Sequence, residues 1–171
     1  MLGEEFYVFE WFRIHFVENN GAAWGVEIGG KIGKLLLTLF RLFAVVGIAY
    51  WLTISIKKNA HRLLITAISL IFAGALGNII DSVFYGVVFD HSYNQLATLF
   101  AEHPYGAIFH GKVVDMFYFP IWQGVLPSWI PKFGGENFTF FNAIFNVADS
   151  AITIGVMILL FFGNKIFPKE S

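Results

Sequence analysis

Cysteine is absent from the 171 residues of this chain, and charged residues make up only 13% of it. Without cysteine the chain has no disulfide framework, thiolate metal site or cysteine nucleophile. It also lacks a basic stripe, and a formal net charge of −1 provides no electrostatic field for a nucleic-acid partner. A soluble domain typically has about a quarter of its residues charged. The scarcity of charge therefore indicates a membrane protein.

Apolar side chains are abundant instead: 57% of the residues are hydrophobic, and 21 are Phe. A helix that crosses a bilayer needs roughly 20 mainly apolar residues. Three stretches meet this requirement, so the sequence predicts a mainly α, polytopic membrane helix bundle that forms a single domain over residues 1–171. The predicted spans are residues 35–56, 63–84 and 141–162.

Basic residues predict the orientation of these spans. The turn Lys57–Arg62 between the first two spans is basic, and Lys165 and Lys169 follow the third. Short basic segments stay in the cytoplasm. Residues 1–34 and 85–140 are therefore predicted to lie on the outer, periplasmic side.

The two outer regions differ in character. Phe6–Val17 is rich in aromatic and β-branched residues, which predicts strands and hence a small β-rich cradle. Trp122 and Trp129 lie among prolines, a composition that suits an irregular loop resting on the lipid headgroups. Residues 91–110 are expected to hold a short amphipathic helix.

Polar side chains gather near the outer ends of two predicted spans. Asn78 and Asp81 lie near the end of the second span, and Asn146 and Asp149 lie in the first turns of the third. An Asp inside a span costs about 2.5–3.5 kcal/mol on insertion scales, so each such residue is a functional candidate. Each Asn precedes its Asp by three residues, which predicts that both share one helical face. Asp149 is expected roughly 10 Å below the outer boundary.

Two further segments bring polar groups to the same layer. Asp115 follows Gly111 in the outer region that leads to the third span, and Asn19 precedes the first span within a turn signal that includes Gly21. Taken alone, Asp115 is also typical of a solvated turn residue. The convergence of four segments on one membrane face is the strongest functional signal in the sequence.

A carboxylate pair is the chemistry that remains after other sites are considered. The chain has no Gly-x-Ser-x-Gly elbow and no His-Glu-x-x-His run, and neither Ser82 nor Ser150 has a His or Lys one helical turn away. The irregular spacing of the loop histidines is not that of a metal site. Two close Asp residues share a proton, so that one can activate water while the other protonates the substrate.

Other interpretations of single residues remain open at this point. Asp149, Asn78 and Asn146 also suit hydrogen bonds that join helices. Arg41, near the outer end of its span, is expected to reach the headgroups. Gly74 and Gly77 are spaced for close helix contact.

Four blocks of the sequence resemble the successive blocks of the lipoprotein signal peptidase family, also called signal peptidase II. They occur in the family's order and extend over nearly the whole chain. The blocks are Asn19–Trp24 (NNGAAW), Gly74–Asp81 (GALGNIID), Gly111–Asp115 (GKVVD) and Phe145–Ala151 (FNVADSA).

The resemblance implies an endopeptidase that cuts just before the diacylglyceryl-modified Cys of a bacterial prolipoprotein. It implies an aspartic mechanism without metal or other cofactor, with Asp115 and Asp149 as the catalytic pair. The expected protein is a multi-pass monomer of the bacterial inner membrane, in contact with membrane lipid, with its site at the periplasmic face. Six residues are expected to bind substrate or support the site: Asn19, Gly21, Asn78, Asp81, Asn146 and Ala148.

The chain departs from the family's pattern in three places. Ser82 follows Asp81 where the family usually has Arg, and Arg41 is one candidate to replace that Arg. The family has four spans, the first with an Asp-Gln-x-x-Lys motif, whereas this chain begins beyond that span. We therefore expect an internal methionine at Met1 or a truncated chain, with impaired insertion. The stretch 90–110 is also longer than expected.

Two other functions are compatible with the same residues. Intramembrane Asp residues equally suit a small transporter or a proton relay, although here they concentrate at one face. An inactive, truncated lipoprotein-binding protein is the third alternative.

Overall fold

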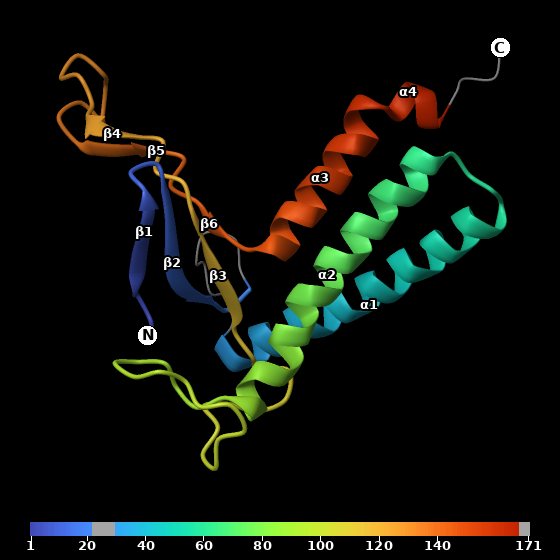
Figure 1. The fold of residues 1–171 in the computed structure, drawn as a ribbon, viewed down its shortest axis with the longest axis horizontal. Helices are drawn as coiled ribbons and strands as arrows, with labels where there is room; N and C mark the ends of the chain where they lie inside the picture. Colours follow the sequence, from blue (N-terminus) through green and yellow to red (C-terminus); the bar gives the residue numbers. More distant parts are fainter. Residues whose placement is uncertain (22–29, 168–171) are drawn as a thin grey trace.

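The computed structural model describes residues 1–21 and 30–167, and combines a group of helices with β-structure at one end of them (Figure 1). The elements in chain order are β1 (Glu5–Phe9), β2 (Phe12–Asn19), α1 (Gly30–Lys57), α2 (Arg62–Val88), β3 (Val113–Tyr118), β4 (Trp122–Val125), β5 (Asn137–Phe140), β6 (Ile144–Phe145), α3 (Val147–Phe161) and α4 (Gly163–Ile166).

The long helices α1 and α2 contain the first two predicted spans. Both are long and apolar enough to cross a membrane. Large apolar side chains such as Phe40 and Phe43 are exposed along α1, as expected for a helix that crosses a membrane. The predicted basic turn lies between the two helices. Asn59 adopts a left-handed φ of 49° there, and the His61 side chain accepts a hydrogen bond from the Leu63 N–H at the start of α2.

The third predicted span is not confirmed, and its first part is wrong. Phe141 has a left-handed φ of 63°, Ile144–Phe145 forms strand β6, and α3 begins only at Val147. With 15 residues, α3 is about 22 Å long, against a hydrocarbon core about 30 Å thick. Asp149 consequently lies in the first turn of the helix.

Helix α2 lies between α1 and α3 (Figure 1). Glycines allow α2 and α3 to approach closely, because a Cβ on Gly74 would collide with the Ala148 carbonyl oxygen. Farther along, a Cβ on Gly155 would lie 2.7 Å from the Ala67 carbonyl oxygen. The predicted tight helix contact at Gly74 is thus confirmed, and it sets the position of the first turn of α3.

The predicted strands over Phe6–Val17 are confirmed as the β1–β2 hairpin. This hairpin belongs to a four-stranded sheet in the order β1-β2-β3-β6, in which all pairs are antiparallel. Phe119, directly after β3, stacks on Phe12 of β2, with ring centroids 4.7 Å apart. The β-rich region expected from the sequence therefore exists.

The expectations for residues 85–140 were partly wrong. Strand β3 crosses this region, and β4 and β5 form a separate two-stranded ribbon where an irregular loop was expected. The amphipathic helix expected over residues 91–110 is absent from this fully described stretch, which consists of turns and a single bridge between Phe89 and Leu99. Val, Phe, Trp and Thr in the strands suit pleated sheet, a preference that the prolines nearby obscured.

Candidate active site

Strand β3 begins beside the C-terminal part of α2, where a glycine allows close contact between the two backbones. A Cβ on Gly111 would collide with the Asp81 carbonyl oxygen, and the Gly111 N–H donates to the Ser82 carbonyl oxygen at 2.8 Å. Two residues into the strand, the Val114 N–H donates to Asp81 Oδ2 at 3.4 Å. The backbone that carries Asp115 is therefore attached to α2 on both sides of Lys112.

Asp115 lies on β3 and is buried, with 5% of its surface exposed. Its Oδ1 accepts a hydrogen bond from Asn146 Nδ2 at 2.8 Å, and its Oδ2 accepts one from Asn19 Nδ2 at 3.1 Å. The sheet register explains the second contact: Val17 pairs with Asp115, so Asn19 is a diagonal neighbour on the same face. Burial raises the pKa of Asp115; the Asn19 bond opposes this, and the negative charge of Asp149 adds to it.

Asp149 lies at the third position of α3, where it closes a capping box. Its Oδ2 accepts from the Asn146 backbone N–H at 3.2 Å, while Asn146 Oδ1 accepts from the Asp149 N–H at 2.9 Å. Its other oxygen, Oδ1, accepts from Asn78 Nδ2 at 2.8 Å. The partial positive charge of a helix N-terminus favours a negative charge at this position.

Asn146 connects the two acids. Its Nδ2 donates to Asp115 Oδ1 and also lies 3.0 Å from Asn78 Oδ1 and 3.3 Å from the Val114 carbonyl oxygen. Its backbone and its Oδ1 hold Asp149. Asp115 and Asp149, which lie 34 positions apart in the sequence, therefore belong to one hydrogen-bonded network around a single buried amide.

The other predicted support residues surround this network in different ways. Asp81 holds the backbone of β3 at Val114 and, among the described residues, forms no hydrogen bond with Asp115 or Asp149. Gly21 has a φ of 89°, a conformation that favours glycine, and its N–H donates to Asn19 Oδ1 at 2.7 Å. Ala148 forms the helix contact with Gly74. Residues 22–24 of the first sequence block lie outside the described residues.

Arg41 turns inward, so the expectation that it reaches the headgroups was wrong. The half-buried guanidinium donates through Nη2 to the Gly21 carbonyl oxygen. It is also close enough to Asp149 for the opposite charges to attract. The sequence signal for this inward position was the presence of an Arg within an otherwise apolar span. The two serines beside the network bond to backbone: Ser82 Oγ donates to the Asn78 carbonyl oxygen and Ser150 Oγ to that of Asn146.

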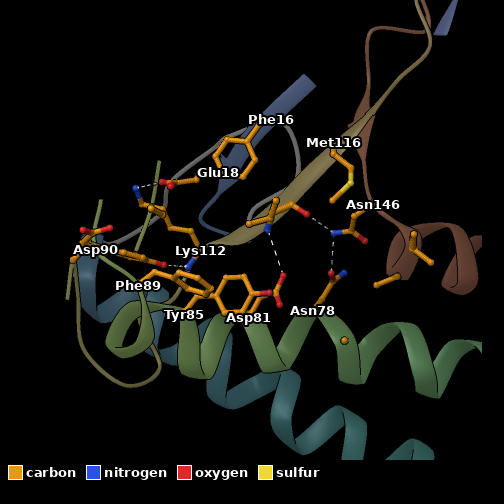
Figure 2. A pocket seen from close by; sticks show the side chains of 16 residues that line it. Phe16, Glu18, Asn78, Asp81, Tyr85, Phe89, Asp90, Lys112, Met116 and Asn146 are labelled. Atoms are coloured by element: carbon orange, nitrogen blue, oxygen red, sulfur yellow. Dashed lines mark hydrogen bonds and ion pairs between the residues drawn. The ribbon is translucent and has the colours of Figure 1, made fainter. Parts of the chain in front are cut away.

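A pocket of about 420 Å³ adjoins the network, with Asn78 and Asn146 in its wall (Figure 2). It lies between α2 and strands β2 and β3, and the stretch after α2 contributes Phe89 and Tyr105. Lys112 Nζ bonds Glu18 Oε2 at 2.6 Å on one side of it. Sequence reasoning missed this ion pair, because its two members are 94 residues apart.

The part of the chain that the structure describes contains no group of three or more His, Asp or Glu residues arranged to hold a metal ion. The groups that the network offers for chemistry are two carboxylates, three amides and a guanidinium: those of Asp115, Asp149, Asn19, Asn78, Asn146 and Arg41.

The chain is similar to known proteins over most of its length. The profile of the family described as signal peptidase (SPase) II matches residues 2–164. The lipoprotein signal peptidase of Porphyromonas gingivalis is 51% identical over 162 residues, which cover 94% of this chain and 70% of that protein. The lipoprotein signal peptidase of Amoebophilus asiaticus is 36% identical over 154 residues, 88% of this chain and 60% of that protein.

Solved structures point the same way. A bacterial membrane enzyme solved by the in meso method at 1.9 Å resolution superposes with a TM-score of 0.58 at 27% identity, covering 98% of this chain and 79% of that one. A second, solved at 2.3 Å, gives 0.54 at 29% identity, with 100% of this chain and 79% of that one covered. These matches identify a membrane-embedded peptidase. The chain belongs to the signal peptidase II family, and the resemblance seen in the sequence is confirmed.

Proposed function

We propose that this chain removes the signal peptide from diacylglyceryl-modified bacterial prolipoproteins, with Asp115 and Asp149 as its catalytic pair. The cleavage itself follows from membership of the signal peptidase II family and from relatives that carry the name lipoprotein signal peptidase. The aspartic mechanism is supported chiefly by one observation: the Asn146 residue hydrogen-bonds both acids.

The two acids have different surroundings, and these suggest different roles. Asp149 lies at a helix N-terminus and faces Arg41, so a negative charge is favoured there. Burial raises the pKa of Asp115, which favours its protonated form. In the proposed mechanism Asp149 accepts a proton from water, while Asp115 donates its proton to the scissile carbonyl oxygen.

The remaining steps follow from proton balance. The hydroxyl formed from water adds to the carbonyl carbon, and the proton now on Asp149 passes to the departing amine as the peptide C–N bond breaks. Asp115 recovers a proton as the carbonyl re-forms. Asn146 and Asn78 keep both carboxylates in place during this exchange, because each donates to at least one of them.

The location of the site suits a substrate that is itself a membrane helix. The network lies where α3 begins and beside the outer half of α2, and the sheet adjoins it. In the proposed orientation the basic Lys57–Arg62 turn faces the cytoplasm, so this end of the helices faces the periplasm across the bacterial inner membrane. A signal peptide could then enter from the lipid, and its lipid-bearing Cys would remain at the headgroup level.

The test is a cleavage assay in lipid vesicles with a prolipoprotein that already carries diacylglycerol. We expect signal-peptide release by the unaltered chain and by Glu102→Gln, a matched loss of an exposed acid, and none by Asp115→Asn or Asp149→Asn. Each variant must insert into the vesicles to the same extent. Full cleavage by either Asp variant would refute the aspartic mechanism.

The same assay separates the alternatives. A transporter or proton relay would leave the prolipoprotein intact and unbound. A lipoprotein-binding protein without activity would retain it uncut.

A further inference from the structure

The β4–β5 ribbon has one aromatic face and one polar face. Strand register places Trp122 opposite Phe140 and Gly124 opposite Phe138, so these four residues share a face. The Trp122 ring lies over Gly124 and is 6.2 Å from the Phe138 ring, measured between centroids. The other face presents Gln123 opposite Thr139 and Val125 opposite Asn137. Neither strand contains a charged residue.

The described residues leave the aromatic face uncovered. The ribbon is a sheet separate from the four-stranded one, and β4 and β5 contact chiefly each other. Trp122 is 50% exposed and Phe140 55% exposed, and Trp129 in the connecting turn is 79% exposed. A two-stranded hairpin alone is marginally stable in water. A surface that covers these rings would supply the missing stabilisation.

The short distance to α3 identifies that surface. Residues 141–146 alone separate the end of β5 from the first residue of α3, so at most about 25 Å of extended chain joins them. The ribbon is therefore held near the end of an apolar helix in a membrane-embedded protein. A bilayer that covers the exposed apolar side chains of α1 would also surround the beginning of α3, where the ribbon is attached. Trp and Phe are the side chains that suit the boundary between headgroups and acyl chains.

We propose that the aromatic face of the β4–β5 ribbon docks into the headgroup region of the surrounding bilayer, with its polar face toward water. The ribbon thereby forms a second membrane contact beside the helices, and the segment from β6 to Asp149 is held between two lipid-anchored elements. The aromatic face takes no part in the proposed catalytic chemistry. The docking proposal and the proposed function can therefore be refuted independently.

The absence of cysteine makes the test direct, since one introduced Cys carries one nitroxide label. Trp122→Cys and Phe138→Cys place labels on the aromatic face and each leave the other rings in place. Gln123→Cys, adjacent to Trp122, is the matched site on the polar face, and Glu102→Cys is an exposed site in the stretch between α2 and β3. Each variant is reconstituted in phosphatidylethanolamine and phosphatidylglycerol vesicles and checked for prolipoprotein cleavage.

The readout is the ratio of label collisions with oxygen, which concentrates in lipid, to collisions with a water-soluble nickel chelate. We expect this ratio to be several-fold higher at Trp122 and Phe138 than at Gln123 and Glu102. Equal exposure to the nickel chelate on both faces would overturn the proposal, because the ribbon would then lie in water. Shielding of the aromatic-face labels from both reagents would also overturn it, in favour of a protein partner such as a second copy.

Discussion

Replacement of Asn146 by Ser separates its two functions in the structure. The residue caps α3 through its Oδ1 and donates from its Nδ2 to Asp115. Serine is about as good an N-cap as Asn. It has no amide nitrogen, however, so Asn146→Ser removes the Nδ2 contacts, among them the 2.8 Å hydrogen bond to the Asp115 carboxyl, while it keeps the cap. Asn146→Ala removes both.

The magnitudes follow from these two contacts. A hydrogen bond to a charged group contributes about 1.5–3 kcal/mol, which corresponds to a loss of roughly 10- to 150-fold in kcat if the bond positions the acid in the transition state. Loss of an N-cap costs about 1 kcal/mol of stability. We therefore expect a large fall in kcat for both variants, and a lower Tm for Asn146→Ala than for Asn146→Ser, because only the Ala variant also loses the cap.

The assay combines single-turnover cleavage of a diacylglyceryl prolipoprotein with thermal unfolding in detergent, on both variants. If Asn146→Ser cleaves at nearly the unaltered rate, the amide bridge between the acids has no catalytic importance. If its Tm falls as far as that of Asn146→Ala, the separation of cap and bridge is wrong.

Two further predictions concern packing and protonation. Gly74→Ala should lower stability by about 1–3 kcal/mol, because its Cβ overlaps the Ala148 carbonyl oxygen, whereas Gly47→Ala, with no atom within 4 Å, should raise it by roughly 0.5–1 kcal/mol. Equal Tm values would contradict this. Asn19→Ala removes a hydrogen bond that favours ionised Asp115, so the pKa of Asp115 should rise further and the alkaline limb of the pH–rate profile should move to higher pH. If the alkaline limb of the pH–rate profile stays at the same pH, Asp115 does not control that limb.

The sign of the Asp115 effect on stability follows from the same shift. Its folded-state pKa is raised, so the protonated form is the one that folding favours. The stability that this carboxyl contributes is therefore greatest at low pH and is lost as pH rises through the raised pKa.

Two Asn-x-x-Asp sequences illustrate how far sequence reasoning reached. Asn78 and Asp81 lie inside α2, as predicted, whereas Asn146 and Asp149 form a capping box at the start of α3. The spacing is the same in both, because three residues separate neighbours on a helical face and also the partners of a cap. A cap signature before an apolar run was visible at Asn146, and it would have corrected the start of the third helix.

The sequence alone determined the membrane class of the protein, its two long helices, the basic turn between them and the family. These depend on composition, periodicity and ordered blocks, which are local or read directly from the chain. Only the tertiary structure decided that one buried amide joins Asp115 to Asp149, that Arg41 faces inward, and that Lys112 pairs with Glu18. Such contacts depend on strand register and on glycine-permitted helix approach between segments remote in sequence, and no local pattern specifies either.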